Sequence, residues 1–244
     1  MAQTTAAVVA TMLVVLLVAV QPLRGRQRYR RLLVELEKNP DARRRFYLRG
    51  IATSWIAVGV VAVIGALAGR GPASIRLTLQ HLQPDATQLI VLYVGVAAFA
   101  LGASLIVLWR GNERQIDRFR RQLGGFVAII PRTRVERLTF ALVAVTAGIC
   151  EEVLYRGFGI AYVRWLHPSA GSALLVVVIG ICFGIAHLYQ GPRGVVLTGL
   201  IGGFFTWITL LTGTLAPAIL IHVLVDLRVV ALPSTLSEPV AAPR

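Results

Sequence analysis

The sequence has few charged residues and very few cysteines, and both shortages restrict the kind of protein it can be. Asp, Glu, Lys and Arg make up 15% of its 244 residues, whereas hydrophobic residues make up 56%. Soluble domains average about 25% charged and about 45–50% apolar residues. The composition therefore predicts a chain whose main solvent is lipid. The two cysteines, Cys150 and Cys182, imply no disulfide framework and are interpreted as buried thiols rather than metal ligands.

Acidic residues are scarcer still, at 11 against 25 Lys and Arg, which leaves a net charge of +14. In a soluble protein this excess would suggest a nucleic-acid partner. Here 18 of the 25 basic residues fall in two segments, ten in 23–50 and eight in 109–137. Because both segments directly flank apolar runs, the charge is interpreted as a determinant of membrane topology, and no nucleic-acid partner is expected.

What the sequence has in abundance is long apolar runs. A helix that crosses about 30 Å of hydrocarbon needs about 20 such residues. We therefore predict an all-α, polytopic transmembrane helix bundle of about seven spans. The runs lie at roughly 5–22, 51–69, 87–109, 136–160, 172–189, 194–212 and 215–232.

The distribution of arginine predicts how these spans are oriented. The first apolar run is followed, not preceded, by arginines, which favours a retained first helix over a cleaved signal. The positive-inside rule then places 23–50 and 109–137 in the cytoplasm and the sparsely charged loop 70–86 outside. The expected result is a multi-pass protein of the cytoplasmic membrane with its N-terminus outside and its C-terminus inside.

The fourth apolar run contains charged residues, which are costly in a membrane and need an explanation. Each costs about 2.5–3.5 kcal/mol on insertion scales. Glu152 and Arg156 are four residues apart, so one helix face can pair them. Glu151 points about 100° away from Glu152 and lacks such a local partner. We interpret Glu152 with Arg156 as structural and Glu151 as free to react; the alternative is one ion cluster around Arg156.

Two later apolar runs supply further ionisable groups. His187 follows Phe183 near the end of the fifth run, and His222 and Asp226 share one face of the seventh. An acid so placed can orient an imidazole, or both can hold a metal ion. Together with Glu151 they form a plausible hydrolytic set, with a base for water and groups for a metal or an oxyanion.

These motifs resemble those of the membrane family of CAAX prenyl endoproteases and bacteriocin-processing proteins, known as CPBP or Abi. The family pattern is Glu-Glu-x-x-x-Arg, then Phe-x-x-x-His, then His-x-x-x-Asn or Asp. In this chain, the three motifs occur in that order within about residues 136–230 as Glu151-Glu152-x-x-x-Arg156, Phe183-x-x-x-His187 and His222-x-x-x-Asp226.

The resemblance implies an intramembrane endopeptidase whose Glu151, aided by His187, activates water. His222 and Asp226 would bind a metal or stabilise the oxyanion, and the metal set would be His187, His222 and Asp226 with zinc. Family accounts include a metalloprotease and a metal-independent mechanism. An ionised Asp226, where the eukaryotic CAAX branch has Asn, accepts hydrogen bonds but cannot donate them, which favours the metal. The implied substrate is a membrane-associated or lipidated protein or peptide.

The predicted spans and motifs together divide the chain into three parts. Residues 1–135 hold N-terminal spans and basic cytoplasmic loops, 136–232 hold the catalytic core, and 233–244 form a short tail.

The alternatives to a protease are a non-catalytic membrane scaffold or immunity factor and, less favoured, a transporter, whose repeat symmetry and paired broken helices we do not find. Substrate identity and oligomeric state stay open.

The topology can be tested with reporter fusions. Fusions at Arg30, Ser74 and Arg120 should report inside, outside and inside, because Lys and Arg concentrate in the first and third of these loops. A paired phosphatase and fluorescent-protein reporter measures each location. An external signal at Arg120 would contradict the orientation.

Overall fold

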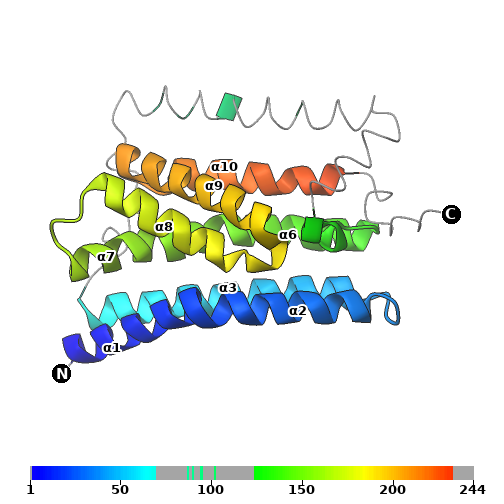
Figure 1. The fold of residues 1–244 in the computed structure, drawn as a ribbon, viewed down its shortest axis with the longest axis horizontal. Coiled ribbons are helices and arrows are strands. Elements are labelled where there is room, and N and C mark those ends of the chain that lie inside the picture. Colours follow the sequence, from blue (N-terminus) through cyan, green and yellow to red (C-terminus); the bar gives the residue numbers. More distant parts are fainter. Residues whose placement is uncertain are drawn as a thin grey trace.

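The computed structural model describes residues 2–69 and 124–232, with five isolated positions between them (Thr87, Ile90, Val94, Gly95 and Gly102). The two ranges contain helices and no strand, as the all-α prediction requires. The helices run roughly along one axis, with the N-terminal helices on one side of the bundle and α9 and α10 toward the other (Figure 1).

The N-terminal part is a long helical hairpin. α1 (Ala2–Val15), a π-helical turn η1 (Leu16–Val20) and α2 (Gln21–Glu35) follow one another without a break, because the residues at both junctions keep helical backbone angles. After a turn, α3 (Ala42–Leu67) runs back beside them (Figure 1). The continuous α1–α2 helix thus changes from apolar to basic along its length, and α3 changes from basic back to apolar.

The second part begins with a capped helix. Thr133 accepts a hydrogen bond from the backbone of Glu136, and the Glu136 carboxylate accepts one from the backbone of Thr133, so α6 (Arg134–Glu151) starts with a capping box. The elements in this part are η3 (Gly124–Ile129), α6, the π-helix η4 (Glu152–Gly159), α7 (Ile160–Leu166), α8 (Ser172–Ala186), η5 (Leu188–Gln190), α9 (Gly191–Thr212), α10 (Ala216–Leu227) and η6 (Arg228–Ala231).

Within the two described ranges, four helical segments are long and apolar enough to cross a membrane: Ala2–Glu35, Ala42–Leu67, Arg134–Leu166 and Leu188–Thr212. They make this an integral, multi-pass membrane protein. The predicted spans at 172–189 and 215–232 correspond to the shorter helices α8 and α10, of 15 and 12 residues. The predicted span at 87–109 lies outside the described ranges, so the count of seven stays a prediction.

Close helix packing surrounds the fourth predicted span. A Cβ atom on Gly148 of α6 would lie 2.4 Å from Cγ2 of Val223 on α10, so only glycine permits this approach. A Cβ on Gly184 of α8 would lie 2.6 Å from the Val195 carbonyl oxygen of α9. Small residues at such contacts let helix backbones meet in lipid, and here they bring α6 to α10 and α8 to α9.

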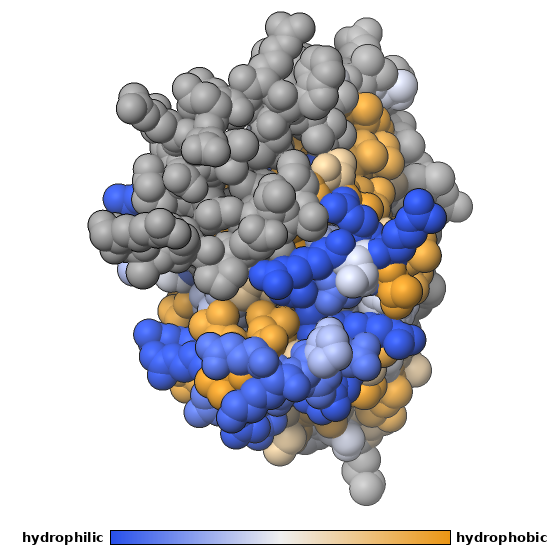
Figure 2. Space-filling model, turned by 90° about the vertical axis from the view of Figure 1, so that its right-hand side faces the viewer, coloured by the Kyte–Doolittle hydropathy of each residue, from blue (hydrophilic) through white to orange (hydrophobic). Residues whose placement is uncertain are grey.

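One end of the bundle is secured by polar contacts. The buried Arg43 of α3 pairs with Glu136 at 3.1 Å and donates to the Ala128 carbonyl at 3.0 Å. Arg137 donates to the carbonyls of Val230 and Leu232. Figure 2 shows hydrophilic side chains gathered over the end that holds the α2–α3 turn. The first predicted basic segment, 23–50, therefore lies at one end of the bundle.

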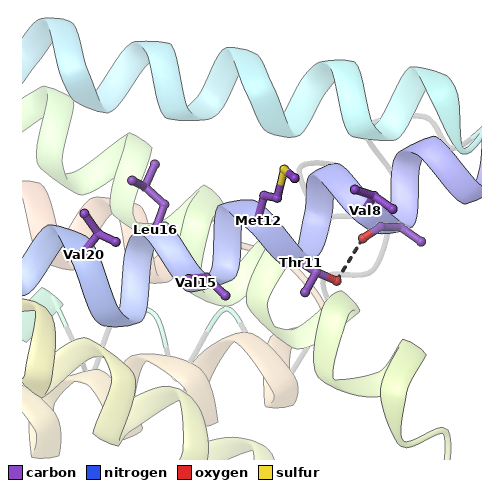
Figure 3. Close-up of a pocket in the computed structure, with 7 residues that line it drawn as sticks. Val8, Thr11, Met12, Val15, Leu16 and Val20 are labelled. Atoms are coloured by element: carbon purple, nitrogen blue, oxygen red, sulfur yellow. Dashed lines mark hydrogen bonds between the residues drawn. The ribbon is translucent and has the colours of Figure 1, made fainter.

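A groove of about 570 Å³ runs along the outer face of α1 and η1 (Figure 3). Its lining is apolar apart from Thr11, whose hydroxyl donates to the Ala7 carbonyl at 2.9 Å. A face whose one polar group is satisfied internally suits contact with lipid chains. None of the predicted site residues lines this groove.

Candidate active site

The paired glutamates lie where the backbone changes its helical form. Glu151 is the last residue of α6, and Glu152 is the first residue of η4. The apolar run at 136–160 predicts one membrane-spanning helix, and within it η4 has the i→i+5 hydrogen bonds of a π-helix. Short π segments within α-helices are frequent at functional sites. The wider turn begins at the second glutamate of the motif.

Arg156 is completely buried, and both of its Nη atoms donate hydrogen bonds, whereas Nε has no hydrogen-bond partner in the described residues. One Nη atom donates to Oε1 of Glu152 at 3.0 Å, and the other donates to the Gly202 carbonyl of α9 at 2.9 Å. The guanidinium carbon lies 4.2 Å from the ring centroid of Phe183 and 5.5 Å from that of Phe205. The predicted pairing of Glu152 with Arg156 is confirmed, and aromatic faces complete the cation's environment.

Glu152 has a second partner that the sequence analysis missed. Its Oε1 also accepts a hydrogen bond of 2.7 Å from Nδ1 of His222 on α10. Glu152 is itself fully buried. The carboxylate therefore joins Arg156 to His222, and it holds the imidazole in a fixed orientation. No local spacing could reveal this contact, because the two residues are 70 positions apart.

Glu151 occupies a different environment from its neighbour. Its Oε2 lies 3.9 Å from Nε2 of His187 and 3.9 Å from Nε2 of His222. Within the described parts of the chain, this oxygen is buried and has no hydrogen-bond partner. The side chain as a whole is 26% exposed. A carboxylate oxygen thus faces two imidazole nitrogens across a gap longer than a hydrogen bond.

Hydrogen bonds at the opposite ring nitrogens determine which atoms the histidines present. Nδ1 of His187 lies 2.8 Å from the carbonyl oxygen of Phe183, which can only accept, so Nδ1 is the donor. Nδ1 of His222 donates in the same way to the Glu152 carboxylate. Each Nε2 is therefore directed at Glu151, and it carries a lone pair when its ring is neutral.

Asp226 lies at the edge of this group. Its Oδ2 is 3.6 Å from Nε2 of His222, beyond hydrogen-bond distance, and its side chain is 34% exposed. The sequence analysis considered Asp226 as the partner that orients His222, but Glu152 makes the short bond to that ring. The structure thus brings all six predicted residues together, with Asp226 the most exposed of the four acidic and histidine side chains around Glu151.

The predicted zinc set can be compared with this arrangement. Two imidazoles and a carboxylate are suitable ligand types for zinc. Across residues 2–69 and 124–232, however, no three His, Cys, Asp or Glu side chains are grouped so that they could hold a metal ion. His187, His222 and Asp226 therefore have the right chemistry for a metal site without its geometry, and the zinc assignment stays a prediction.

Comparison with known families agrees with the motifs. Residues 134–228 match the model of the family described as type II CAAX prenyl endopeptidase Rce1-like. The chain contains an Rce1-like domain. Membership of this domain in a family of endopeptidases implies a protease. The Rce1-like domain includes all six predicted site residues, whereas the α1–α3 hairpin lies outside it. No curated protein and no solved structure matches the chain.

Loss of the Arg156 side chain should unfold the Rce1-like domain. Arg156→Ala would leave the Glu152 carboxylate buried without its cation, at a cost of about 3–5 kcal/mol. Folded yield and melting temperature in detergent measure the effect. Arg49→Ala, which removes an exposed arginine of α3, is the control and should stay within about 0.5 kcal/mol of the parent protein. Equal stability of the two variants would contradict the importance of the buried pair.

Proposed function

We propose that the protein is an intramembrane endopeptidase that hydrolyses a peptide bond of a membrane-associated or lipidated protein or peptide. The observation that carries this proposal is the Glu151 carboxylate oxygen, which is buried, has no hydrogen-bond partner in the described part of the chain, and faces two imidazole nitrogens at 3.9 Å. The Rce1-like domain supports the class of reaction.

The spacing of these groups suits a water molecule as the nucleophile. Atoms that are 3.9 Å apart are too far for a direct hydrogen bond, and a water molecule beside both can bridge them. Such a water would donate one hydrogen to Oε2 of Glu151 and the other to Nε2 of His187. Its oxygen lone pair would then point toward a substrate carbonyl carbon, which is the arrangement required for general-base catalysis.

The protons and bonds balance with Glu151 acting twice. As the water oxygen bonds to the carbonyl carbon, Glu151 takes one water proton and the carbonyl oxygen becomes an oxyanion. Glu151 then gives this proton to the peptide nitrogen as the carbon–nitrogen bond breaks. The products are a carboxyl group and an amine, and Glu151 returns to its ionised state.

His222 is the proposed stabiliser of the oxyanion. In its protonated form it donates from Nδ1 to Glu152 and keeps Nε2–H for the developing negative charge. Asp226, 3.6 Å from Nε2, adds a negative charge beside the imidazolium. Because the bond to Glu152 fixes the ring, little reorganisation is needed during the reaction. This role uses side chains alone and no step through a metal ion.

The membrane topology belongs to the same proposal. Seven spans with an outside N-terminus would place the first basic segment, and with it the α2–α3 turn, on the cytoplasmic side. Four long apolar helices support the multi-pass arrangement.

Removing the charge of Glu151 should abolish hydrolysis and leave the fold intact. Glu151→Gln keeps the size of the side chain but cannot accept the proton, so we expect turnover to fall about 10²–10⁴-fold, the usual contribution of a general base. The measurement is proteolysis of a peptide panel, with and without lipid modification, by purified protein. Glu35→Gln, at an exposed carboxylate of α2, is the control. Wild-type turnover in Glu151→Gln would contradict the role of Glu151 as the general base.

Chelation and Asp226 variants distinguish the side-chain mechanism from a zinc-dependent one. Because Glu152 already orients His222, we expect Asp226→Asn to keep activity within a few-fold and the parent enzyme to survive exhaustive chelation. A zinc site of His187, His222 and Asp226 would instead lose metal and activity together in Asp226→Asn, by about 10-fold or more. Metal content and proteolysis are measured on the same samples, with Asp226→Ala alongside. Joint loss of metal and activity would replace the side-chain mechanism with a metalloprotease.

A further inference from the structure

His187 is the proposed catalytic residue that lies outside a helix, one position past the end of α8. Glu151 and His222 lie within continuous helical segments. His187 instead follows the last residue of α8, with φ −97° and ψ 26°, and precedes the single turn η5. The chain then reverses at Gly191, whose φ of 82° is in the left-handed region that favours glycine. Its helix contributes the bond from Nδ1 to the Phe183 carbonyl, and any further restraint on the ring must come from residues beyond α8.

The His187 ring is packed by one aromatic ring from α8 and by another that lies beyond it. Phe183 lies 4.8 Å from the His187 ring, and Tyr189 lies 5.9 Å from it, between ring centroids. Tyr189 packs in turn on Tyr29 of α2, at 5.8 Å and an interplanar angle of 38°. A continuous series of rings therefore leads from the N-terminal hairpin to the imidazole beside Glu151.

The middle ring of this series is itself held in place. The Tyr189 hydroxyl accepts a hydrogen bond of 3.2 Å from Gln190, whose side-chain oxygen accepts one of 3.1 Å from Thr198 on α9. Tyr29 and Tyr189 also pack against one cluster of buried residues, which includes Leu32. The Tyr189 side chain is thus linked to α9 through Gln190 and packs directly on Tyr29 of α2, so loss of the α2 contact would remove one of its two restraints.

We propose that Tyr29 is a positioning residue of the hydrolytic site, and that it acts through Tyr189 to hold the His187 imidazole opposite Glu151. The inference rests on the proposed function. It means that the hydrolytic unit includes α2, which lies outside the Rce1-like domain at 134–228. Tyr29 needs only its ring for this role, since ring packing transmits the restraint.

The competing explanation is that Tyr29 merely stabilises the fold, and the chain offers a matched control for it. Tyr162 of α7 also packs on aromatic neighbours, with its ring centroid 5.8 Å from Phe158 and 5.7 Å from Trp165. Its hydroxyl donates to Thr11 of α1 at 3.1 Å, so it too joins the N-terminal hairpin to the Rce1-like domain. It makes no ring contact with His187 among the described residues.

The test compares Tyr29→Leu, Tyr29→Phe and Tyr162→Leu in the full-length protein. We expect Tyr29→Leu to lower kcat about 3- to 10-fold, the size of a typical aromatic pair contribution, with KM nearly unchanged. Tyr29→Phe should restore kcat, and Tyr162→Leu should lower the melting temperature without a matching loss of kcat. Equal losses of kcat in Tyr29→Leu and Tyr162→Leu would overturn the inference. Should Tyr29→Leu fail to fold, Tyr29→Met takes its place.

A second measurement separates failure of this inference from failure of the proposed function. In protein labelled with ¹³C at histidine, the His187 ring signal is identified by its loss in His187→Asn. Tyr29→Leu should shift that signal, and Tyr162→Leu should leave it in place. A His187 signal unmoved in Tyr29→Leu overturns the positioning role. A shifted signal in a protein that cleaves no peptide supports the positioning role and refutes the protease.

Discussion

A fully buried arginine in an apolar helix bundle is the constraint on which the rest of the site depends. The Arg156 guanidinium can neither reach water nor be left without partners, because an unpaired buried charge costs several kcal/mol. Its two Nη atoms donate to Glu152 within η4 and to the Gly202 carbonyl of α9, and its guanidinium carbon lies over the Phe183 ring of α8. One side chain thereby fixes three elements relative to one another.

The same constraint divides two adjacent and chemically identical residues into different roles. Glu152 is committed to Arg156 and, through the same oxygen, to His222 on α10. Glu151 is left with an oxygen that has no hydrogen-bond partner in the described residues, directed at two imidazoles. Glu152 is less suited to act as a base, since its Oε1 is held by Arg156 and His222, whereas Oε2 of Glu151 lies 3.9 Å from both Nε2 atoms. The proposed reactivity of Glu151 therefore depends on how its neighbour is used.

Close packing makes this arrangement possible in lipid. The hydrophobic effect does little to bring apolar helices together in lipid, so their association depends on van der Waals packing and interhelical hydrogen bonds. Gly148 lets α10 approach α6 closely enough for His222 to reach Glu152. Gly184 lets α8 and α9 pack closely against each other. The hairpin of α1–α3 adds Tyr29 to the support of His187. Catalytic and structural contacts are thus shared between the Rce1-like domain and the helices before it.

Features that depend on local spacing and composition can be predicted from the sequence alone. The low charge and long apolar runs specify membrane helices, and a spacing of four specifies the Glu152–Arg156 pair. The ordered motifs were sufficient to select the six residues that the fold brings together. The apolar run at 136–160 predicts a membrane-spanning helix, but its composition carries no sign of the π-helical turn η4.

Only the tertiary structure decided which of these residues touch across helices. The bond from His222 to Glu152 spans 70 positions, and the ring contact from Tyr29 to Tyr189 spans 160. Periodicity defines the direction of a side chain around its own helix axis, but not which neighbouring helix lies there. That choice depends on glycine contacts such as Gly148 against Val223, whose effect appears only when both helices are in place.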